Sequence, residues 1–293
     1  MSPDHASEHP RDILHSHGLR ARRSAGQNFL LSPKVAARIV QEARVGPQDV
    51  VLEIGTGLGQ LTVPLAQAAH AVVSVEIDRG FCEIARERLE ALSNVVLLCA
   101  DFLASKHCIN PAVSEAVLPL TQGHPLKVVS NLPFQISSPA LINLLEWEVA
   151  AEMDVMLQKE VVERLTAHPG AAAYGPLTVF TAYWAQVEEV FSLPPTAFWP
   201  QPAVSSAFVR LTPRAPCPRA ENYQVFSEAV RKLFQSRRKT LRRALEQGWG
   251  RPSAQLVMSA LPLDRTVRPD RLAVEDFVRI GDVLAAERER TDT

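Results

Sequence analysis

The chain has 293 residues, of which 46% are hydrophobic and 22% charged, with 31 Lys and Arg against 32 Asp and Glu. This length can bury the core of one or two ordinary domains, and the composition excludes intrinsic disorder and collagen-like repetition. No apolar run approaches the roughly 18 residues that span a bilayer, and the first residues are polar where a signal peptide needs an apolar stretch. We therefore expect a cytoplasmic protein without a membrane partner.

Charge is divided unevenly along the chain, although the formal net charge is only −1. Residues 46–150 carry five basic and eleven acidic side chains, a balance of −6, whereas residues 205–250 carry ten basic and three acidic, a balance of +7. This division predicts a small ligand on the first part and a polyanion on the second. Alternatively, the ten basic residues could belong to a helical face that contacts only solvent.

The cysteines form no CxxC pair and have no regular spacing; they are Cys82, Cys99, Cys108 and Cys217. This pattern argues against a disulfide framework and a zinc cluster, so we expect buried or incidental thiols and no metal site. Four of the eight histidines lie in the first 17 residues, which we assign to a disordered, solvated tail.

Taken in chain order, five apolar segments predict strands, at residues 50–55, 71–78, 95–101, 127–133 and 153–158. None alternates with polar residues, as is typical of strands buried on both faces of a parallel sheet. Helical patterns lie between them; at residues 80–92, for example, apolar positions recur three and four apart. The alternation predicts an α/β fold with a Rossmann-like doubly wound sheet.

The later part of the chain changes character. Residues 191–211 combine a proline-rich stretch with a last strand, and residues 212–220 hold three prolines without periodicity, which makes them a candidate linker. Everything after them has a helical pattern. We expect a tail at residues 1–19, an α/β domain at 20–212 and a small helical domain at 213–293.

The first strand leads into a glycine-rich turn that includes Gly55, Gly57 and Gly59. Dinucleotide folds use G-x-G-x-x-G, whereas the third glycine here comes one residue early and Glu53 precedes the first. Such a turn lets a ligand approach the backbone at the edge of the sheet. The variant spacing suits S-adenosylmethionine (SAM), which has no pyrophosphate to bind.

Acidic residues end the next two strands. Glu76 follows Gly55 by 21 residues, close to the spacing at which an acid accepts the ribose hydroxyls of a nucleotide, and Asp101 could accept from an adenine amine. Either residue alone could be a helix cap. The first predicted strand ends in the glycine-rich turn, and the next two end in an acidic residue. Three such strand ends at one edge of the sheet favour a ligand site.

The fourth strand ends in Asn131, Leu132, Pro133 and Phe134. The exocyclic amine of a base needs acceptors for its two N–H bonds, which the Asn131 side chain and the Leu132 carbonyl can supply. Pro133 fixes the loop, and Phe134 offers an aromatic face. Asn-x-Pro-aromatic is the arrangement of amino-methyltransferases.

The sequence resembles the ribosomal RNA adenine-N6,N6-dimethyltransferases, most closely the KsgA-type small-subunit enzymes. The resemblance covers about residues 20 to 280, and the matching segments are GQNFL (26–30), VLEIGTGLGQLT (51–62), NLPFQIS (131–137), LQKEVVERL (157–165), YGPLTV (174–179), PPTAFWPQPAVSSAFVRL (194–211) and RRKTLRRAL (237–245).

The resemblance implies roles for individual residues. Asn28 and Leu30 would close over SAM, and Phe134 and Phe198 would sandwich the flipped target base. The residues implied to bind the cofactor are Asn28, Leu30, Gly55, Gly57, Glu76, Asp101 and Asn131. Two positions depart from the family's usual pattern, because Thr56 stands where Pro is commoner and Phe134 where Tyr is commoner. Thr56 also occurs in the large-subunit enzymes that confer macrolide resistance.

Two basic clusters could contact RNA phosphates. One precedes the SAM segment and the other lies in the helical domain; together they comprise Arg20, Arg22, Arg23, Arg237, Arg238, Lys239, Arg242 and Arg243. The expected activity is transfer of methyl groups from SAM to N6 of two adjacent adenosines in small-subunit (16S) rRNA during ribosome biogenesis, by a monomer without a metal.

Two alternatives remain at this point, and a third is disfavoured. A large-subunit (23S) rRNA adenine-N6 methyltransferase shares the motifs, and a catalytically silent ribosome-assembly factor could keep the fold. An NAD-linked oxidoreductase would need a G-x-G-x-x-G turn, which is not present in the predicted sheet.

Overall fold

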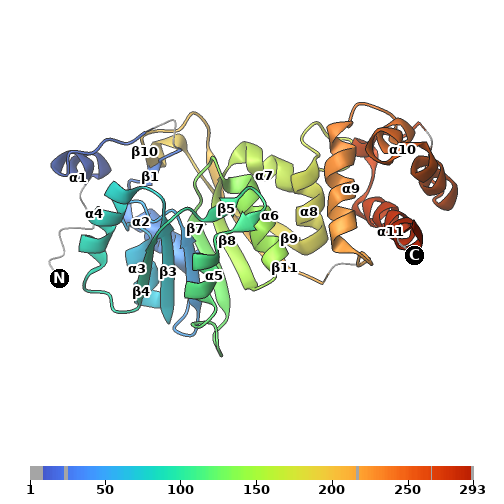
Figure 1. The fold of residues 1–293 in the computed structure, drawn as a ribbon. Coiled ribbons are helices and arrows are strands. Elements are labelled where there is room, and N and C mark those ends of the chain that lie inside the picture. Colours follow the sequence, from blue (N-terminus) through green and yellow to red (C-terminus); the bar gives the residue numbers. More distant parts are fainter. Residues whose placement is uncertain (1–8, 23–25, 216–217, 265, 292–293) are drawn as a thin grey trace. The chain divides into compact units, whose positions relative to one another are not determined.

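The computed structural model describes residues 9–22, 26–215, 218–264 and 266–291 (Figure 1). They form two compact units, which we call the sheet unit (Met1–Val162 and Gln186–Pro213) and the helical unit (Glu163–Ala185 and Arg214–Thr293). The boundary at Pro213 falls inside the segment that the sequence marks as a linker.

The sheet unit is built on seven strands, most of them parallel. Their spatial order is β4 (Val95–Cys99), β3 (Ala71–Glu76), β2 (Val50–Ile54), β7 (Leu126–Asn131), β8 (Ala150–Gln158), β11 (Ser206–Pro213) and β9 (Ala185–Leu193). Strands β4, β3, β2, β7 and β8 pair in parallel, and β11 is antiparallel to β8. The predicted α/β fold with a doubly wound, mostly parallel sheet is confirmed.

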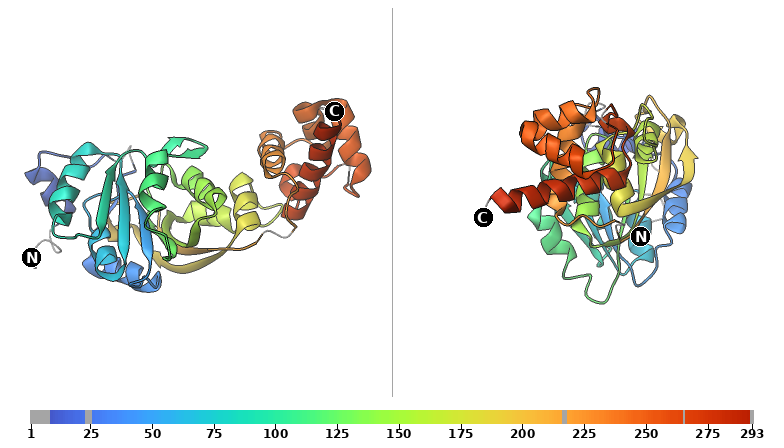
Figure 2. Two further views of the ribbon diagram at one scale, coloured as in Figure 1. Left: turned by 60° about the horizontal axis from the view of Figure 1, so that its bottom comes forward. Right: turned by 90° about the vertical axis from the view of Figure 1, so that its right-hand side faces the viewer.

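Burial explains why the strand segments lack alternation. Both β2 and β3 are buried along their whole length, because helices lie on both sides of the sheet (Figure 2). The helices of this unit are α1 (Pro10–Ser16), α2 (Pro33–Glu42), α3 (Thr62–Ala68), α4 (Arg79–Leu89), α5 (Pro111–Val117) and α6 (Ser137–Trp147). Two small antiparallel pairs, β1 (Phe29–Leu30) with β10 (Phe198–Trp199) and β5 (Leu103–Ser105) with β6 (Cys108–Ile109), were not predicted.

The expected disordered tail is wrong for its described part. Residues 10–16 form α1, which has Pro10 in its first turn, and Ile13 and Leu14 are only 5% and 1% exposed. They pack in one cluster with Phe29 and Phe81, and this apolar contact holds the segment in place.

The helical unit contains α8 (Pro176–Trp184), α9 (Tyr223–Gln235), α10 (Leu241–Ala260), the short η4 (Pro269–Arg271) and α11 (Val274–Thr291), while α7 (Lys159–Leu165) runs across the boundary. The continuous helical pattern over residues 223–248 is in fact interrupted by a turn between α9 and α10. A further break lies at Gly250, whose φ of 87° no helix allows.

Residues 163–185 belong with the helical unit and not, as expected, with residues 20–212. Helix α8 is buried along most of its length. The ring of Phe180 meets that of Phe226 edge-on at 6.1 Å, and Tyr183 stacks on the same ring at 4.6 Å. This aromatic contact with α9 gives α8 its core.

Candidate active site

A pocket of about 410 Å³ lies at the carboxyl ends of β2, β3, β4 and β7. That volume is within the range of small-molecule sites, and this edge is where doubly wound sheets bind ligands. The sequence-predicted residues that line it are Arg22, Asn28, Leu30, Gly55, Gly57, Glu76, Asp101, Asn131, Leu132, Pro133 and Phe134. The structure therefore brings together residues from the N-terminal segment and from four strands.

The glycine turn and the Asn-x-Pro loop are in close contact. Gly55 has a φ of 89°, and a Cβ atom built on it would lie 2.8 Å from Cγ of Pro133. The Gly55 N–H donates to the carbonyl of Val75, 2.8 Å away, which fixes the turn against β3. Only glycine fits both the backbone conformation and the space beside Pro133.

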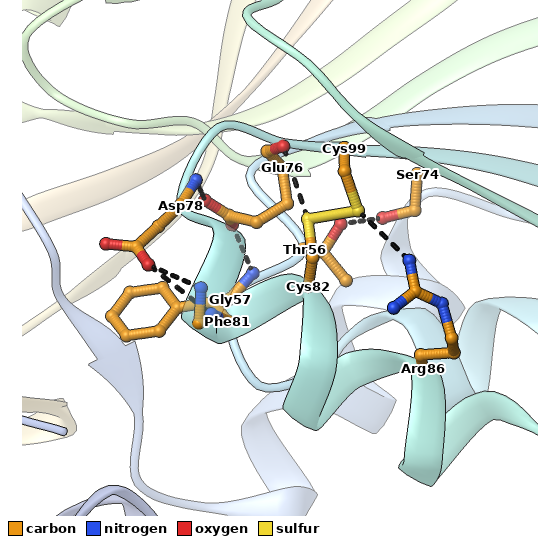
Figure 3. The surroundings of a disulfide bond; sticks show 10 residues. Thr56, Gly57, Ser74, Glu76, Asp78, Phe81, Cys82, Arg86 and Cys99 are labelled. Carbon is orange, nitrogen blue, oxygen red and sulfur yellow. Dashed lines mark hydrogen bonds between the residues drawn. A yellow bond between two sulfur atoms is a disulfide. The ribbon is translucent and has the colours of Figure 1, made fainter. Parts of the chain in front are cut away.

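The Glu76 carboxylate is held by the backbone at the end of β3. Its two oxygens accept from the N–H groups of Gly57 at 2.8 Å and of Asp78 at 2.9 Å (Figure 3). The side chain is 6% exposed, and this burial raises the pKa of Glu76 despite the two hydrogen bonds. Each oxygen retains a lone pair with which to accept a ligand hydroxyl.

Asp101 follows β4 and is exposed at the rim of the pocket. Its Oδ1 accepts from the Leu103 N–H at 3.0 Å, and its carbonyl accepts from the Asn110 side chain at 2.9 Å. These bonds fix the loop while Oδ2 can still accept from an amine.

The Asn131 side chain has a defined orientation. Its Nδ2 donates to the Asn28 carbonyl, 2.9 Å away, so Oδ1 is the atom that can accept a hydrogen bond from a ligand. Phe134 lines the same pocket and is half-buried, and its carbonyl accepts from the Ser137 hydroxyl at 3.0 Å. An acceptor and an aromatic face thus lie on one short loop.

Phe198 does not line the pocket, which contradicts the expected base sandwich. It pairs with Leu30 across β1 and β10, is 1% exposed, and belongs to the main hydrophobic cluster with Met156 and Phe208. Neighbouring residues on a strand face opposite sides. The next residue, Trp199, is half-buried, and its ring stacks on Phe29 at 6.4 Å.

Glu53 also lines the pocket, although it was not predicted from the sequence to be a site residue. Its Oε2 accepts from the hydroxyls of Thr62 and Ser74, both at 2.6 Å, and the Ser74 hydroxyl also lies 2.6 Å from that of Thr56. Burial raises the pKa of Glu53 to about 8, against the opposing effect of these hydrogen bonds. An acid inside an otherwise apolar strand was the signal that could have identified it.

The expectation of unpaired thiols is wrong for Cys82 and Cys99, which form a disulfide (Figure 3). They lie on α4 and at the end of β4, and both elements flank β3. Their separation of 17 residues follows no motif, so spacing gave no signal. Cys108 is exposed and unpaired, and Cys217 lies outside the described residues.

The N-terminal basic cluster is only partly described. Arg20 is exposed, and Arg22 lines the pocket while its backbone N–H donates to the Gln27 side chain at 2.7 Å. Arg23 lies outside the described residues.

The second basic cluster lies in the turn before α10 and in its first turn. Arg238, Lys239, Arg242 and Arg243 are exposed. Arg237 differs from them, because it donates to the Ala172 carbonyl at 3.2 Å and lies 3.7 Å from Asp270. It therefore connects parts of the helical unit, whereas the other four face solvent.

Among the residues that the structure describes, no group of three or more His, Cys, Asp or Glu side chains could hold a metal ion. None of the helices described is long and apolar enough to cross a membrane.

The sheet and the glycine, acid and Asn-x-Pro features at one edge are those of a methyltransferase. A model of the ribosomal RNA adenine dimethylase family matches residues 18–286, and the chain belongs to that family. The resemblance found in the sequence is thereby confirmed.

Two bacterial relatives, both named ribosomal RNA small subunit methyltransferase A, are each 39% identical to the chain. The protein of Magnetococcus marinus aligns over 271 residues, 92% of this chain and 94% of the relative. That of Lactiplantibacillus plantarum aligns over 283 residues, 94% of this chain and 93% of the relative.

Solved structures show the same fold. A dimethyladenosine transferase from Plasmodium falciparum superposes with a TM-score of 0.67 at 23% identity, covering 90% of this chain and 98% of its own. The 23S rRNA methyltransferase ErmE gives a TM-score of 0.61 at 26% identity, and the match covers 88% of this chain and 99% of the ErmE chain.

Proposed function

We propose that this protein transfers methyl groups from SAM to N6 of two adjacent adenosines in small-subunit (16S) rRNA during ribosome biogenesis, acting as a cytoplasmic monomer. Family membership and the 39% identical small-subunit relatives support this choice of RNA. The structural observation that supports it most is Asn131, whose Oδ1 can accept from an amine in the pocket that Glu76 also lines.

The residues that line the pocket fit the hydrogen-bonding groups of SAM. Glu76 would accept the ribose hydroxyls with the lone pairs that Gly57 and Asp78 leave available, and Asp101 would accept the adenine amine through Oδ2. Gly55, Gly57, Asn28 and Leu30 would enclose the rest of the molecule. Bound SAM supplies a methyl group on a positively charged sulfur.

The loop from Asn131 to Phe134 would bind the target base. The Asn131 Oδ1 and the Leu132 carbonyl would accept the two N6–H bonds, which directs the nitrogen lone pair out of the ring plane. Pro133 limits the motion of the loop, and the Phe134 ring would stack on the base. Positioning supplies most of the rate enhancement, since no covalent intermediate is needed.

RNA would be bound by charge on both units. The exposed Arg20 and the pocket-lining Arg22, with Arg23, would contact phosphates near the flipped adenosine. Arg238, Lys239, Arg242 and Arg243 would contact phosphates elsewhere on a folded RNA surface. We therefore expect a partly assembled small subunit to be a better substrate than a short oligonucleotide.

The test is incubation with methyl-labelled SAM and separately purified, unmethylated small and large subunits, followed by nucleoside analysis. We expect N6,N6-dimethyladenosine in the small subunit only, and much less of it with an Asn131→Ala control. Label in the large subunit would favour the activity of ErmE. Binding to small subunits without label under conditions in which SAM binds would favour a silent assembly factor.

A further inference from the structure

The disulfide lies beside the residues proposed to hold the nucleoside of SAM. Cys99 is the register partner of Glu76 on β3 and precedes Asp101 by two residues. The Cys82 sulfur lies 3.5 Å from the Glu76 carbonyl oxygen (Figure 3). The bond thus connects the helix that follows Glu76 to the strand that precedes Asp101.

The two sulfurs have different surroundings. Cys82 is 2% exposed, whereas Cys99 is exposed, and the Arg86 Nη2 lies 3.6 Å from the Cys99 sulfur. A neighbouring guanidinium stabilises a thiolate, and accessible thiolates are the reactive form of cysteine. Cys99 is therefore the sulfur that an external thiol can reach, and its thiolate is the one that Arg86 stabilises.

We propose that Cys82 and Cys99 form a reversible redox site that controls how tightly the pocket binds SAM; this rests on the proposed function. In the reducing direction, the thiolate of a small thiol such as glutathione attacks the Cys99 sulfur, and the Cys82–Cys99 bond breaks. Cys82 leaves as a thiolate and takes up a proton. A second thiol then attacks the mixed disulfide at its external sulfur, which releases the Cys99 thiolate beside Arg86 together with the reagent's disulfide.

The bond affects affinity by fixing the geometry of the acids before ligand binding. Helix α4 begins at Arg79, three residues after Glu76, and the Asp78 side chain caps it by accepting from the Gly80 N–H at 3.0 Å. With the disulfide closed, α4 and the end of β4 move together. With it open, α4 and the end of β4 can shift relative to each other, and ligand binding must then restrain them. We expect the oxidised protein to bind about threefold to tenfold tighter, the cost of ordering one or two side chains.

The experiment compares full-length protein treated with oxidised glutathione or with excess dithiothreitol. S-Adenosylhomocysteine affinity is measured by calorimetry, and alkylation with peptide mapping reports which cysteines are paired. The variant is Cys99→Ser, whose side chain is exposed in the parent, and the matched control is Cys108→Ser, at an exposed cysteine that forms no disulfide.

The expected result is a tighter oxidised form for the parent and for Cys108→Ser, and one redox-independent affinity for Cys99→Ser, equal to that of the reduced parent. Equal affinities of the oxidised and reduced parent would overturn the redox site and leave the proposed function standing. Failure of the two cysteines to pair on oxidation would also overturn it. If neither redox form binds the ligand, the SAM assignment fails first.

Discussion

The side chain of Asn131 donates to the backbone carbonyl of Asn28 over 2.9 Å. This bond joins the N-terminal segment to the loop proposed to bind the base, although more than 100 residues separate the two in sequence. It also decides which end of the amide is available, because Nδ2 is occupied and Oδ1 is the acceptor.

Asn131→Ala is expected to abolish most turnover while changing the dissociation constant of S-adenosylhomocysteine comparatively little, since an acceptor for the reacting amine is lost. Asn28→Ala is the matched control, because it keeps the backbone carbonyl that orients Asn131. That variant should mainly weaken cofactor binding. Steady-state kinetics with calorimetry checks both, and normal turnover of Asn131→Ala would exclude the acceptor role.

Glu76→Ala should weaken S-adenosylhomocysteine binding by roughly 1 to 3 kcal/mol, because charge-assisted bonds to the ribose are lost. The control is Glu87→Ala, at an exposed position on α4. Calorimetry measures the affinities, and thermal unfolding verifies that both variants fold. An unchanged affinity for a folded Glu76→Ala protein would rule out the ribose assignment.

The two phenylalanines should behave differently. Phe134→Ala should cost about 1 to 3 kcal/mol of base stacking with little effect on stability, and Phe134→Tyr should remain active. Phe198→Ala should instead lower the free energy of unfolding by about 3 to 5 kcal/mol, because it empties a core position. Urea denaturation and methyl transfer separate the two effects. A fully stable Phe198→Ala protein would contradict its place in the core.

Much of the fold and the pocket could be predicted because they follow from simple rules. Uniformly apolar segments between amphipathic ones indicate a parallel sheet, and the ends of parallel strands meet at one edge. Gly55, Glu76, Asp101 and Asn131 were therefore expected to lie together, as they do.

What could not be predicted depends on side-chain direction and on contacts distant in sequence. Phe198 and Trp199 are adjacent aromatics, and nothing in their pattern says which one faces the core. Cys82 and Cys99 meet only because α4 and β4 both lie against β3. The residues of helix α8 are apolar, and they would be so in either unit. The sequence therefore could not show to which of the two units this helix belongs.

The Glu53 carboxyl predicts a pH dependence of stability. Its pKa is about 8 in the folded protein, against an ordinary value of 4.5, so the folded state holds a proton that the unfolded chain releases. Its contribution to stability is complete below pH 4.5 and is lost as the pH rises toward 8. Glu53→Gln should remove this loss, which is on the order of a few kcal/mol.

Urea denaturation of the parent and of Glu53→Gln across that pH range measures the difference between their free energies of unfolding. Taking the difference cancels the parallel contributions of Glu76 and Asp154, whose pKa values burial also raises. If the curves of unfolding free energy against pH stay parallel for the two proteins, Glu53 is ionised at neutral pH.

The exposed cations of the helical unit predict salt-dependent binding to small subunits. Arg243→Gln should reduce the slope of log affinity against log salt by about 1, since one phosphate contact is lost. Arg279→Gln, an exposed position on α11 beside Asp276, is the matched control and should leave the slope unchanged. Equal slopes for both variants and the parent would show that the face around Arg243 is only solvated.

The division of the helical unit into two stretches of chain has a consequence for synthesis. Helix α8 leaves the translating ribosome before α9, which supplies the partner of Phe180 and Tyr183. At about 5 to 20 residues per second, the apolar face of α8 stays without that partner for some seconds. A chain truncated after Pro213 would keep α8 but never make α9, so such fragments should be prone to aggregation and chaperone binding.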